Sequence, residues 1–278
     1  MSRISTRFTD LKRADRAAFI PFITAGDPDE ETSFAILEKL PQSGADLIEL
    51  GVPFSDPMAD GPAIQAASLR ALNAGMRLSK VLDMVRRFRE RDTTTPIILM
   101  GYFNPIHHYG TEAFVRDAAE AGVDGLITVD LPPEEDGVLR ASADARGLDI
   151  IRLAAPTTDD KRLVTVLQGA SGFLYYVSVA GVTGTTSYAQ ADVATAVARL
   201  KRQSKIPCAV GFGIKTAEQA AAIAQIADGA VVGSAIVSRI AGALESGRSK
   251  DDIVSDVLIF CKELAQSVHA ARAPAVVE

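Results

Sequence analysis

Residues 47–62 read LIELGVPFSDPMADGP, and this stretch gives the clearest indication of the fold. It begins as an apolar, β-prone run and then passes into glycine and proline residues, which end a strand. Glu49 lies inside the apolar run, where an ionisable carboxyl costs free energy unless it is paired, neutralised or used. The loop that follows carries Asp56 and Asp60. A carboxyl near the end of a strand, facing an acidic loop, suits acid–base chemistry.

Similar apolar runs alternate with amphipathic helical patterns along the whole chain. The predicted strands are residues 18–24, 46–51, 96–101, 124–129, 148–153, 173–179, 207–211 and 229–233. They are continuous apolar runs rather than alternations of period two, which is typical of a parallel sheet covered on both faces. Eight β–α units in one chain predict an α/β protein that closes into a (β/α)8 TIM barrel. A doubly wound open sheet is the alternative, although no glycine-rich dinucleotide motif follows the first strand.

Helical patterns fill the intervals between the strands, and a long helical region follows the last one. The predicted helices are residues 30–43, 62–74, 78–91, 111–121, 133–146, 159–168, 190–203, 216–226 and 235–267. An extra amphipathic helix is predicted within residues 1–16, where apolar side chains recur at helical spacing. We therefore expect a single barrel domain over residues 1–278, with a frayed tail at 270–278 that lacks a core pattern.

Composition and charge exclude several classes of protein. The 278 residues are 47% hydrophobic, which fits one globular unit, since α/β barrels commonly reach about 250 residues as a single domain. No apolar run approaches the roughly 18–20 residues of a membrane span. A formal charge of −6 without a basic stripe argues against nucleic acid as a partner. An anionic substrate would therefore be held by local dipoles or by a few cations.

Cysteine usage and the N-terminal residues bear on the compartment. Cys208 and Cys261 are too few for a disulfide framework, so we expect free, buried thiols in a reducing cytoplasm. The N-terminus is rich in Arg and Lys, as transit peptides are, but Asp10 and Asp15 interrupt it and transit peptides are poor in acids. A cytoplasmic protein is the expectation, and import into a plastid is the open alternative.

The active site of a barrel lies at the carboxyl ends of its strands, and this rule selects among the polar residues. Glu49 ends the second strand, and no Lys or Arg lies between Pro41 and Arg70 to pair with it locally. Burial without a cation raises the pKa of a carboxyl, so Glu49 is expected to give and take a proton near neutrality. Asp60 lies in a polar loop and is expected to stay ionised, which would divide two roles between the two carboxyl groups.

Two strand ends that contain glycine predict an anion site. The seventh strand ends in GFG at 211–213 and the eighth in GS at 233–234, each leading into a helix. Glycine lets the main chain approach an anion closely, and a helix N-terminus contributes partial positive charge. The loops after the seventh and eighth strands are the usual phosphate cradle of these barrels. The GVTG turn at 181–184 is expected to complete the cradle, and the alternative is that the glycines only make tight turns.

Aromatic residues near strand ends are candidate walls of a pocket. Phe22, Tyr102 and Phe212 occupy such positions, with packing inside the barrel as the alternative for the first two. His107 and His108 are adjacent in a predicted loop, but no third ligand follows at metal spacing. No metal site is therefore predicted.

Taken together, these segments resemble the tryptophan synthase alpha subunit family, an α/β-barrel family. The resemblance covers about residues 5–265 and rests on PFITAGDP, IELGVPFSDPMADGP, MGYFNPI, AGVDGLITVDLPPEE, SVAGVTG, GFGI and VVGSAIV. It implies cleavage of indole-3-glycerol phosphate to indole and glyceraldehyde 3-phosphate. It also implies a β subunit that uses pyridoxal phosphate and receives the indole, in an α2β2 heterotetramer. The α chain itself is expected to need no organic cofactor and no metal.

The resemblance also implies roles for residues at matching positions. Glu49 is the general acid–base, and Asp60 contacts the indole N–H. Tyr175 is a tyrosine near the substrate, and Thr183 belongs to a loop that closes near Asp60. The residues that match the phosphate site are Gly184, Gly213, Gly233 and Ser234.

A partner surface is expected around the strand-end loops. SDPM at 55–58 and DLPPEE at 130–135 contain prolines, which stiffen a loop so that it loses little entropy on docking. Together with the resemblance, they place Asp56, Asp130 and Pro132 at the interface with the β subunit. Asp56 suits the start of a turn equally well.

The residues leave three other functions open. These are a standalone indole-3-glycerol phosphate lyase, an epimerase or isomerase with the same phosphate cradle, and a non-catalytic subunit that activates a partner. The segment SVAGVTG carries Val179 and Ala180, where some relatives have a basic or hydroxyl residue. This departure leaves the closure of that loop open, and it does not affect the predicted chemistry.

Overall fold

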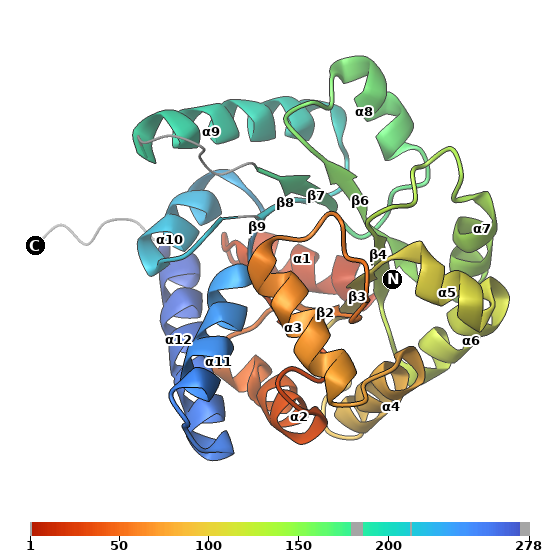
Figure 1. Ribbon diagram of the computed structural model, residues 1–278. Coiled ribbons are helices and arrows are strands. Elements are labelled where there is room, and N and C mark those ends of the chain that lie inside the picture. Colours follow the sequence, from red (N-terminus) through yellow and green to blue (C-terminus); the bar gives the residue numbers. More distant parts are fainter. Residues whose placement is uncertain (1, 179–185, 212, 273–278) are drawn as a thin grey trace, which may run out of the picture.

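The computed structural model describes residues 2–178, 186–211 and 213–272. One parallel sheet contains all its strands, in the order β5-β4-β3-β2-β1-β9-β8-β7-β6. The strands are β1 (Ala18–Thr24), β2 (Ile48–Gly51), β3 (Ile97–Gly101), β4 (Gly125–Thr128), β5 (Asp149–Ile150), β6 (Arg152–Ala154), β7 (Leu174–Val177), β8 (Cys208–Gly211) and β9 (Gly229–Val232). β5 and β6 are the two parts of the single strand predicted at 148–153, so the barrel has eight strand positions. β1 pairs with both β2 and β9, and the sheet curls into the barrel of Figure 1. The prediction of a (β/α)8 barrel is confirmed.

Helices surround the barrel and connect successive strands (Figure 1). They are α1 (Arg3–Arg13), α2 (Glu30–Lys39), α3 (Pro62–Asn73), α4 (Leu78–Arg89), α5 (Phe103–Tyr109), α6 (Thr111–Ala121), α7 (Gly137–Arg146), α8 (Asp160–Leu167), α9 (Thr186–Gln203), α10 (Ala217–Ile226), α11 (Ser234–Glu245) and α12 (Lys250–Ala270). The C-terminal helical region predicted as one is two helices, because Gly247 has a φ of +67° and Ser249 caps the second. Helix α12 continues to Ala270, the first residue of the tail predicted to fray, and residues 273–278 of that tail lie outside the described residues.

Two local predictions are wrong. The segment with His107 and His108, predicted as a loop, is the short helix α5, with a proline tolerated in its first turn and Gly110 at its end. The helix predicted from residue 133 begins only at Gly137, because the acidic and proline-rich residues before it form turns.

Helix α1 closes the amino-terminal end of the barrel, and Figure 1 shows it lying across the centre of the ring of strands. Ile4, Phe8 and Leu11 are buried in the cluster that fills the barrel interior. The rings of Phe8 and Phe173 lie 5.6 Å apart, centroid to centroid. The predicted N-terminal helix is therefore part of the core, and its apolar spacing is explained by this contact.

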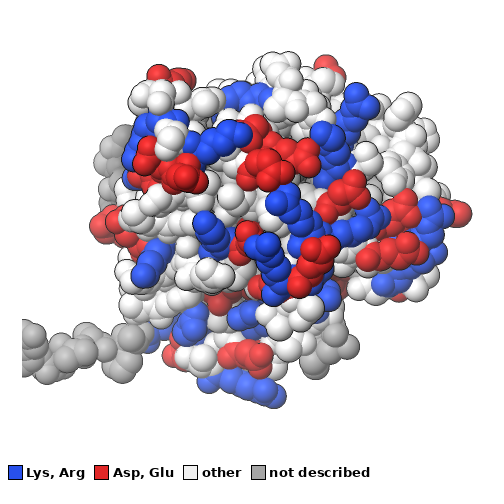
Figure 2. Space-filling model, turned by 90° about the horizontal axis from the view of Figure 1, so that it is seen from below, with Lys and Arg blue, Asp and Glu red and all other residues white. Residues whose placement is uncertain are grey.

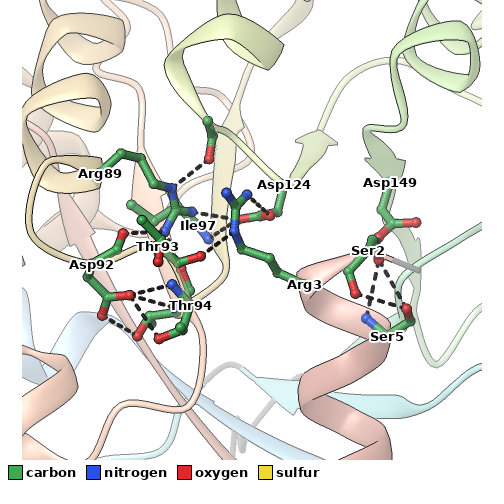
Figure 3. A network of polar contacts seen from close by, with 12 residues as sticks. Ser2, Arg3, Ser5, Arg89, Asp92, Thr93, Thr94, Ile97, Asp124 and Asp149 are labelled. Atoms are coloured by element: carbon green, nitrogen blue, oxygen red, sulfur yellow. Dashed lines mark hydrogen bonds and ion pairs between the residues drawn. The ribbon is translucent and has the colours of Figure 1, made fainter.

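An ionic network fastens α1 to the barrel (Figure 3). Arg3 donates to one carboxylate oxygen of Asp124 at 2.8 Å, and Arg89 donates to the other at 2.6 Å. Asp124 also accepts the N–H of Ile97 at 2.8 Å, which ties the start of β3 to the start of β4. A buried carboxylate that loses its partners destabilises the fold, because its charge is then uncompensated. The charge-assisted hydrogen bonds to Asp124 therefore stabilise this end of the barrel.

The surface mixes charges of both signs. Figure 2 shows Lys and Arg interspersed with Asp and Glu on the face that lies at the bottom of Figure 1. Ion pairs such as Glu30–Lys80 and Glu31–Arg87 join α2 to α4 on the barrel's outside. No helix in the described ranges is long and apolar enough to cross a membrane. Cys208 and Cys261 are free and buried as predicted, and burial raises the pKa of each thiol to about 12.

Candidate active site

Glu49 lies on β2 with its side chain inside the barrel. In the register of the sheet it stands between Phe22 of β1 and Ile98 of β3. The side chain faces the same interior as Leu47, because residues two apart on a strand share a face. Glu49 is 1% exposed, and neither carboxyl oxygen has a hydrogen-bond partner among the described residues. Burial, and to a lesser extent the charge of Asp60, raise the pKa of Glu49 to about 8.

This environment predicts that the stability of the protein depends on pH. The carboxyl has its ordinary pKa of 4.5 in the unfolded chain and a pKa of about 8 in the folded protein. Between these values the folded state binds more protons than the unfolded state, so the free energy of unfolding falls as the pH rises. Each unit of difference in pKa corresponds to about 1.4 kcal/mol.

The variant Glu49→Gln lacks this titration and keeps the shape of the side chain. We expect its stability advantage over the wild type to be smallest near pH 4.5, to grow as the pH rises toward 8, and to level off above. Urea unfolding of both proteins at a series of pH values measures this difference. A difference that stays constant across the series would show that Glu49 does not titrate in this range.

Asp60 lies in the loop that joins β2 to α3. Two turns shape this loop: the N–H of Met58 bonds the carbonyl of Asp56 at 2.9 Å, and the N–H of Asp60 bonds the carbonyl of Pro57 at 3.0 Å. Asp60 is half-buried, and burial raises its pKa while a hydrogen bond from Tyr102 opposes that rise. The carboxyl of Asp60 is thus less exposed to solvent than its position in a polar loop suggests. Its charge contributes to the raised pKa of Glu49.

Tyr175 lies on β7 and is buried in the barrel interior with a raised pKa. Burial is the main cause, and the charge of Glu49 adds to it. Gly211 on β8 leaves the space that the tyrosine hydroxyl fills, because a Cβ there would collide with it. The structure therefore brings Tyr175 and Glu49 into one electrostatic environment.

Phe22 is enclosed by two strand ends. Its ring fills space left by Gly51, and a Cβ on Gly233 would come within 3.3 Å of it. It also packs against Ala67 of α3 and Val237 of α11. Packing contacts therefore account for this position, and a role in lining a pocket stays a prediction.

The described part of the predicted phosphate site lies at the ends of β8 and β9, which are neighbours in the sheet. Gly213 has a φ of +80°, a conformation that favours glycine. Gly233 is the N-cap of α11, and Ser234 is its first residue. The first N–H groups of a helix have no acceptor within it, so those of Ser234 and Ala235 are suited to bind an anion.

Several predicted residues lie outside the described residues. They are Thr183, Gly184 and Phe212, together with Val179 and Ala180. The two adjacent histidines of α5 are exposed, and no group of His, Cys, Asp or Glu in the described ranges is arranged to hold a metal ion.

The residues predicted at a partner interface lie on exposed loops. Asp56 and Pro132 are exposed, and Met58 between the two carboxylates of its loop is 86% exposed. Asp130 is also exposed, and its carboxylate accepts the N–H of Phe103 at 2.7 Å. These loops leave polar and apolar groups free at the surface, and their contact with a partner stays a prediction.

A buried ion pair beneath the loop at 130–135 was not predicted from the sequence. Asp136 and Arg152 are both buried and paired, and Glu134 pairs with Arg162 of α8. A cavity of about 440 Å³ lies beside them, between the end of β4, β6 and α8. Neither Glu49 nor Asp60 lines this cavity.

The fold and the residues at the carboxyl ends of its strands define an enzyme of the (β/α)8-barrel class. Residues 8–269 match the family model of the tryptophan synthase alpha chain, and the chain belongs to this family. The structure is similar to the tryptophan synthase alpha chain of Legionella pneumophila subsp. pneumophila, with 41% identity, a TM-score of 0.89, and coverage of 99% of this chain and 100% of that one. It is also similar to the alpha subunit of Legionella pneumophila str. Paris (43% identity, TM-score 0.89, coverage 96% and 98%). A chain of Mycobacterium tuberculosis tryptophan synthase matches at 38% identity with a TM-score of 0.85, covering 96% and 98%.

Membership in this family establishes the reaction. The alpha chain of tryptophan synthase is a carbon–carbon lyase that cleaves indole-3-glycerol phosphate to indole and glyceraldehyde 3-phosphate. The family implies a beta subunit as partner, which converts the indole to tryptophan. Alpha chains need no cofactor of their own, because pyridoxal phosphate belongs to the beta subunit.

Proposed function

We propose that Glu49 and Asp60 perform the cleavage as a proton shuttle and a charge stabiliser. Glu49, protonated at rest, gives its proton to C3 of the indole ring, which leaves positive charge near the ring nitrogen. Asp60, ionised and hydrogen-bonded to the ring N–H, stabilises that charge where it develops. Glu49 then takes the proton of the adjacent glycerol hydroxyl as the carbon–carbon bond breaks. The bonding electrons return to the ring, an aldehyde forms, and Glu49 is protonated again.

The observation that carries this proposal is the isolation of Glu49. Its carboxyl oxygens are buried and without hydrogen-bond partners among the described residues. A carboxyl with a pKa of about 8 is a competent acid at neutral pH, and its conjugate base is strong enough to remove a hydroxyl proton. An ion pair with Lys or Arg would instead hold the carboxyl ionised and unable to donate.

The remaining predicted residues bind the two ends of the substrate. Gly184, Gly213, Gly233 and Ser234 hold the phosphate through backbone N–H groups and a helix terminus. Tyr175, Phe22, Tyr102 and Phe212 enclose the indole, and Thr183 closes over the site near Asp60. Because the phosphate is remote from the reacting bond, its binding energy can be used to orient that bond.

We also propose that the chain works as a single domain over residues 1–278, in the cytoplasm, within an α2β2 heterotetramer. Exposed Asp56, Asp130 and Pro132 contact the beta subunit in this arrangement. The exposed side chain of Met58 supports a docking surface on the same loop as Asp60. A partner that orders this loop can then change the activity of the alpha chain.

Indole release tests these assignments together. We expect the isolated chain to form indole and glyceraldehyde 3-phosphate in equal amounts, and more rapidly when a beta chain is added. Light scattering of the mixture is expected to give the mass of two chains of each kind. Release that is unaffected by the beta chain would identify a standalone lyase. No release without the beta chain, and slow release with it, would contradict a self-sufficient Glu49–Asp60 pair.

A further inference from the structure

Tyr102 contacts the loop that carries Asp60 at three places. It follows β3, is the N-cap residue of α5, and is 3% exposed. Its hydroxyl accepts the N–H of Ala59 at 3.0 Å and donates to the carboxyl of Asp60. Its ring lies 5.2 Å from the ring of Phe54, centroid to centroid. One side chain at the end of the neighbouring strand thus contacts the loop both near its start, at Phe54, and near its end, at Ala59 and Asp60.

The loop has little else to hold it. Ser55, Asp56, Met58 and Ala59 are exposed, and the loop's own hydrogen bonds are short-range turns. Beyond the loop, the amide of Gln65 donates to the carbonyl of Asp60 at 2.8 Å, a contact that holds the backbone and does not involve the carboxylate. Among the described residues, the hydroxyl of Tyr102 is the group that interacts with the carboxyl of Asp60 itself.

We propose that Tyr102 is a positioning residue: its hydroxyl orients the carboxylate of Asp60 toward the site before the substrate binds. This inference rests on the proposed role of Asp60. It assigns to Tyr102 a task distinct from enclosing the indole, since the task belongs to the hydroxyl and not to the ring. A preorganised carboxylate stabilises developing charge without first having to reorient.

Tyr102 is itself anchored from a third strand. Asp130, in the loop after β4, accepts the N–H of Phe103, the residue next to Tyr102. This bond fixes the start of α5 and therefore the direction in which Tyr102 leaves the backbone. Asp130 in the loop after β4 thus holds the segment after β3, and Tyr102 of that segment in turn holds the loop after β2.

The hydroxyl also has an electrostatic effect that can be measured. Its hydrogen bond lowers the pKa of Asp60 against the effect of burial. The other titratable group that acts on Asp60's surroundings among the described residues is Glu49 of β2, whose pKa the charge of Asp60 raises, and the charge of Asp130 acts on Tyr102. Removal of the hydroxyl is therefore expected to raise the pKa of Asp60, because no cation among these groups replaces the lost donor.

Tyr102→Phe keeps the ring and its contact with Phe54 and removes only the hydroxyl. We expect kcat for indole release to fall about 10-fold, as for one lost hydrogen bond to a charged group, with a smaller change in KM. The acid limb of the pH profile, below which Asp60 is protonated, is expected to move to higher pH. Tyr109→Phe is the matched control: its hydroxyl also bonds a carboxylate, Asp117, at 2.7 Å, but outside the site, and we expect neither change.

A double-mutant cycle separates positioning from general damage. If Tyr102 acts through Asp60, Tyr102→Phe slows the Asp60→Asn protein little further, and the two effects are not additive. Additive effects, or an unchanged acid limb in an otherwise folded Tyr102→Phe protein, would overturn the inference while leaving the proposed function intact. An Asp60→Asn protein as active as the wild type would instead overturn the role of Asp60, and with it this inference.

Discussion

Glu49→Gln should reduce the rate of indole release by about 10³-fold or more. The amide has the shape of the protonated acid but cannot give a proton to carbon or take one from the hydroxyl. General acid–base catalysis contributes roughly 10²–10⁴-fold for a single transfer, and Glu49 is proposed to make two. The measurement is single-turnover indole formation with the purified variant, which is insensitive to product release.

Glu30→Gln is the matched control for this experiment. Glu30 lies on α2 outside the barrel and pairs with Lys80, so the same chemical change there should leave indole formation unaltered. Circular dichroism of both variants reports whether the barrel is intact. Indole formation by pure Glu49→Gln protein at a rate near that of the wild type would remove Glu49 from the mechanism.

Asp60→Asn should slow turnover by at least about 10²-fold, the usual loss when one electrostatic stabiliser is removed from a transition state. The amide can still accept a hydrogen bond from the indole N–H, but it carries no charge to balance the positive ring. We therefore expect kcat and kcat/KM to fall together, as for an interaction made in the transition state. Steady-state kinetics over a range of substrate concentrations, from well below KM to saturation, measures both constants.

Asp83→Asn, an exposed position on α4 that pairs with Arg86, provides the control for charge removal. An Asp60→Asn protein whose KM rises while kcat stays constant would show that Asp60 binds the substrate and does not stabilise the transition state. Both Asp60→Asn and Glu49→Gln are informative because each keeps the volume of the side chain it replaces.

The strands were predictable because their burial on both faces leaves a continuous apolar run. Each predicted strand corresponds to an observed one within two residues at either end, apart from the break between β5 and β6 at Ile151. The short helix α5 was not predictable in this way. Its seven residues are stabilised by tertiary contacts such as that of Asp130 with the N–H of Phe103, which no local pattern reveals.

The environment of Glu49 could be anticipated, because the sequence around it lacks Lys and Arg, and the structure places the carboxyl buried and unpaired among the described residues. The environment of Asp60 could not. Its partial burial and its bond with Tyr102 depend on two loops from different strands meeting at the barrel rim, 42 residues apart in the chain. The same holds for the buried pair of Asp136 and Arg152, whose partners are separated by a helix and a strand.

The position of α1 determines at which end of the barrel the substrate can enter and the products can leave. With Ile4, Phe8 and Leu11 packed into it, the amino-terminal end of the barrel is closed in the described part of the chain. Indole and the triose phosphate are then expected to leave at the carboxyl ends of the strands, where the substrate enters. A protein bound over this end of the barrel would receive the indole before it diffused into bulk water. Transfer to the next enzyme therefore needs no second opening in the barrel.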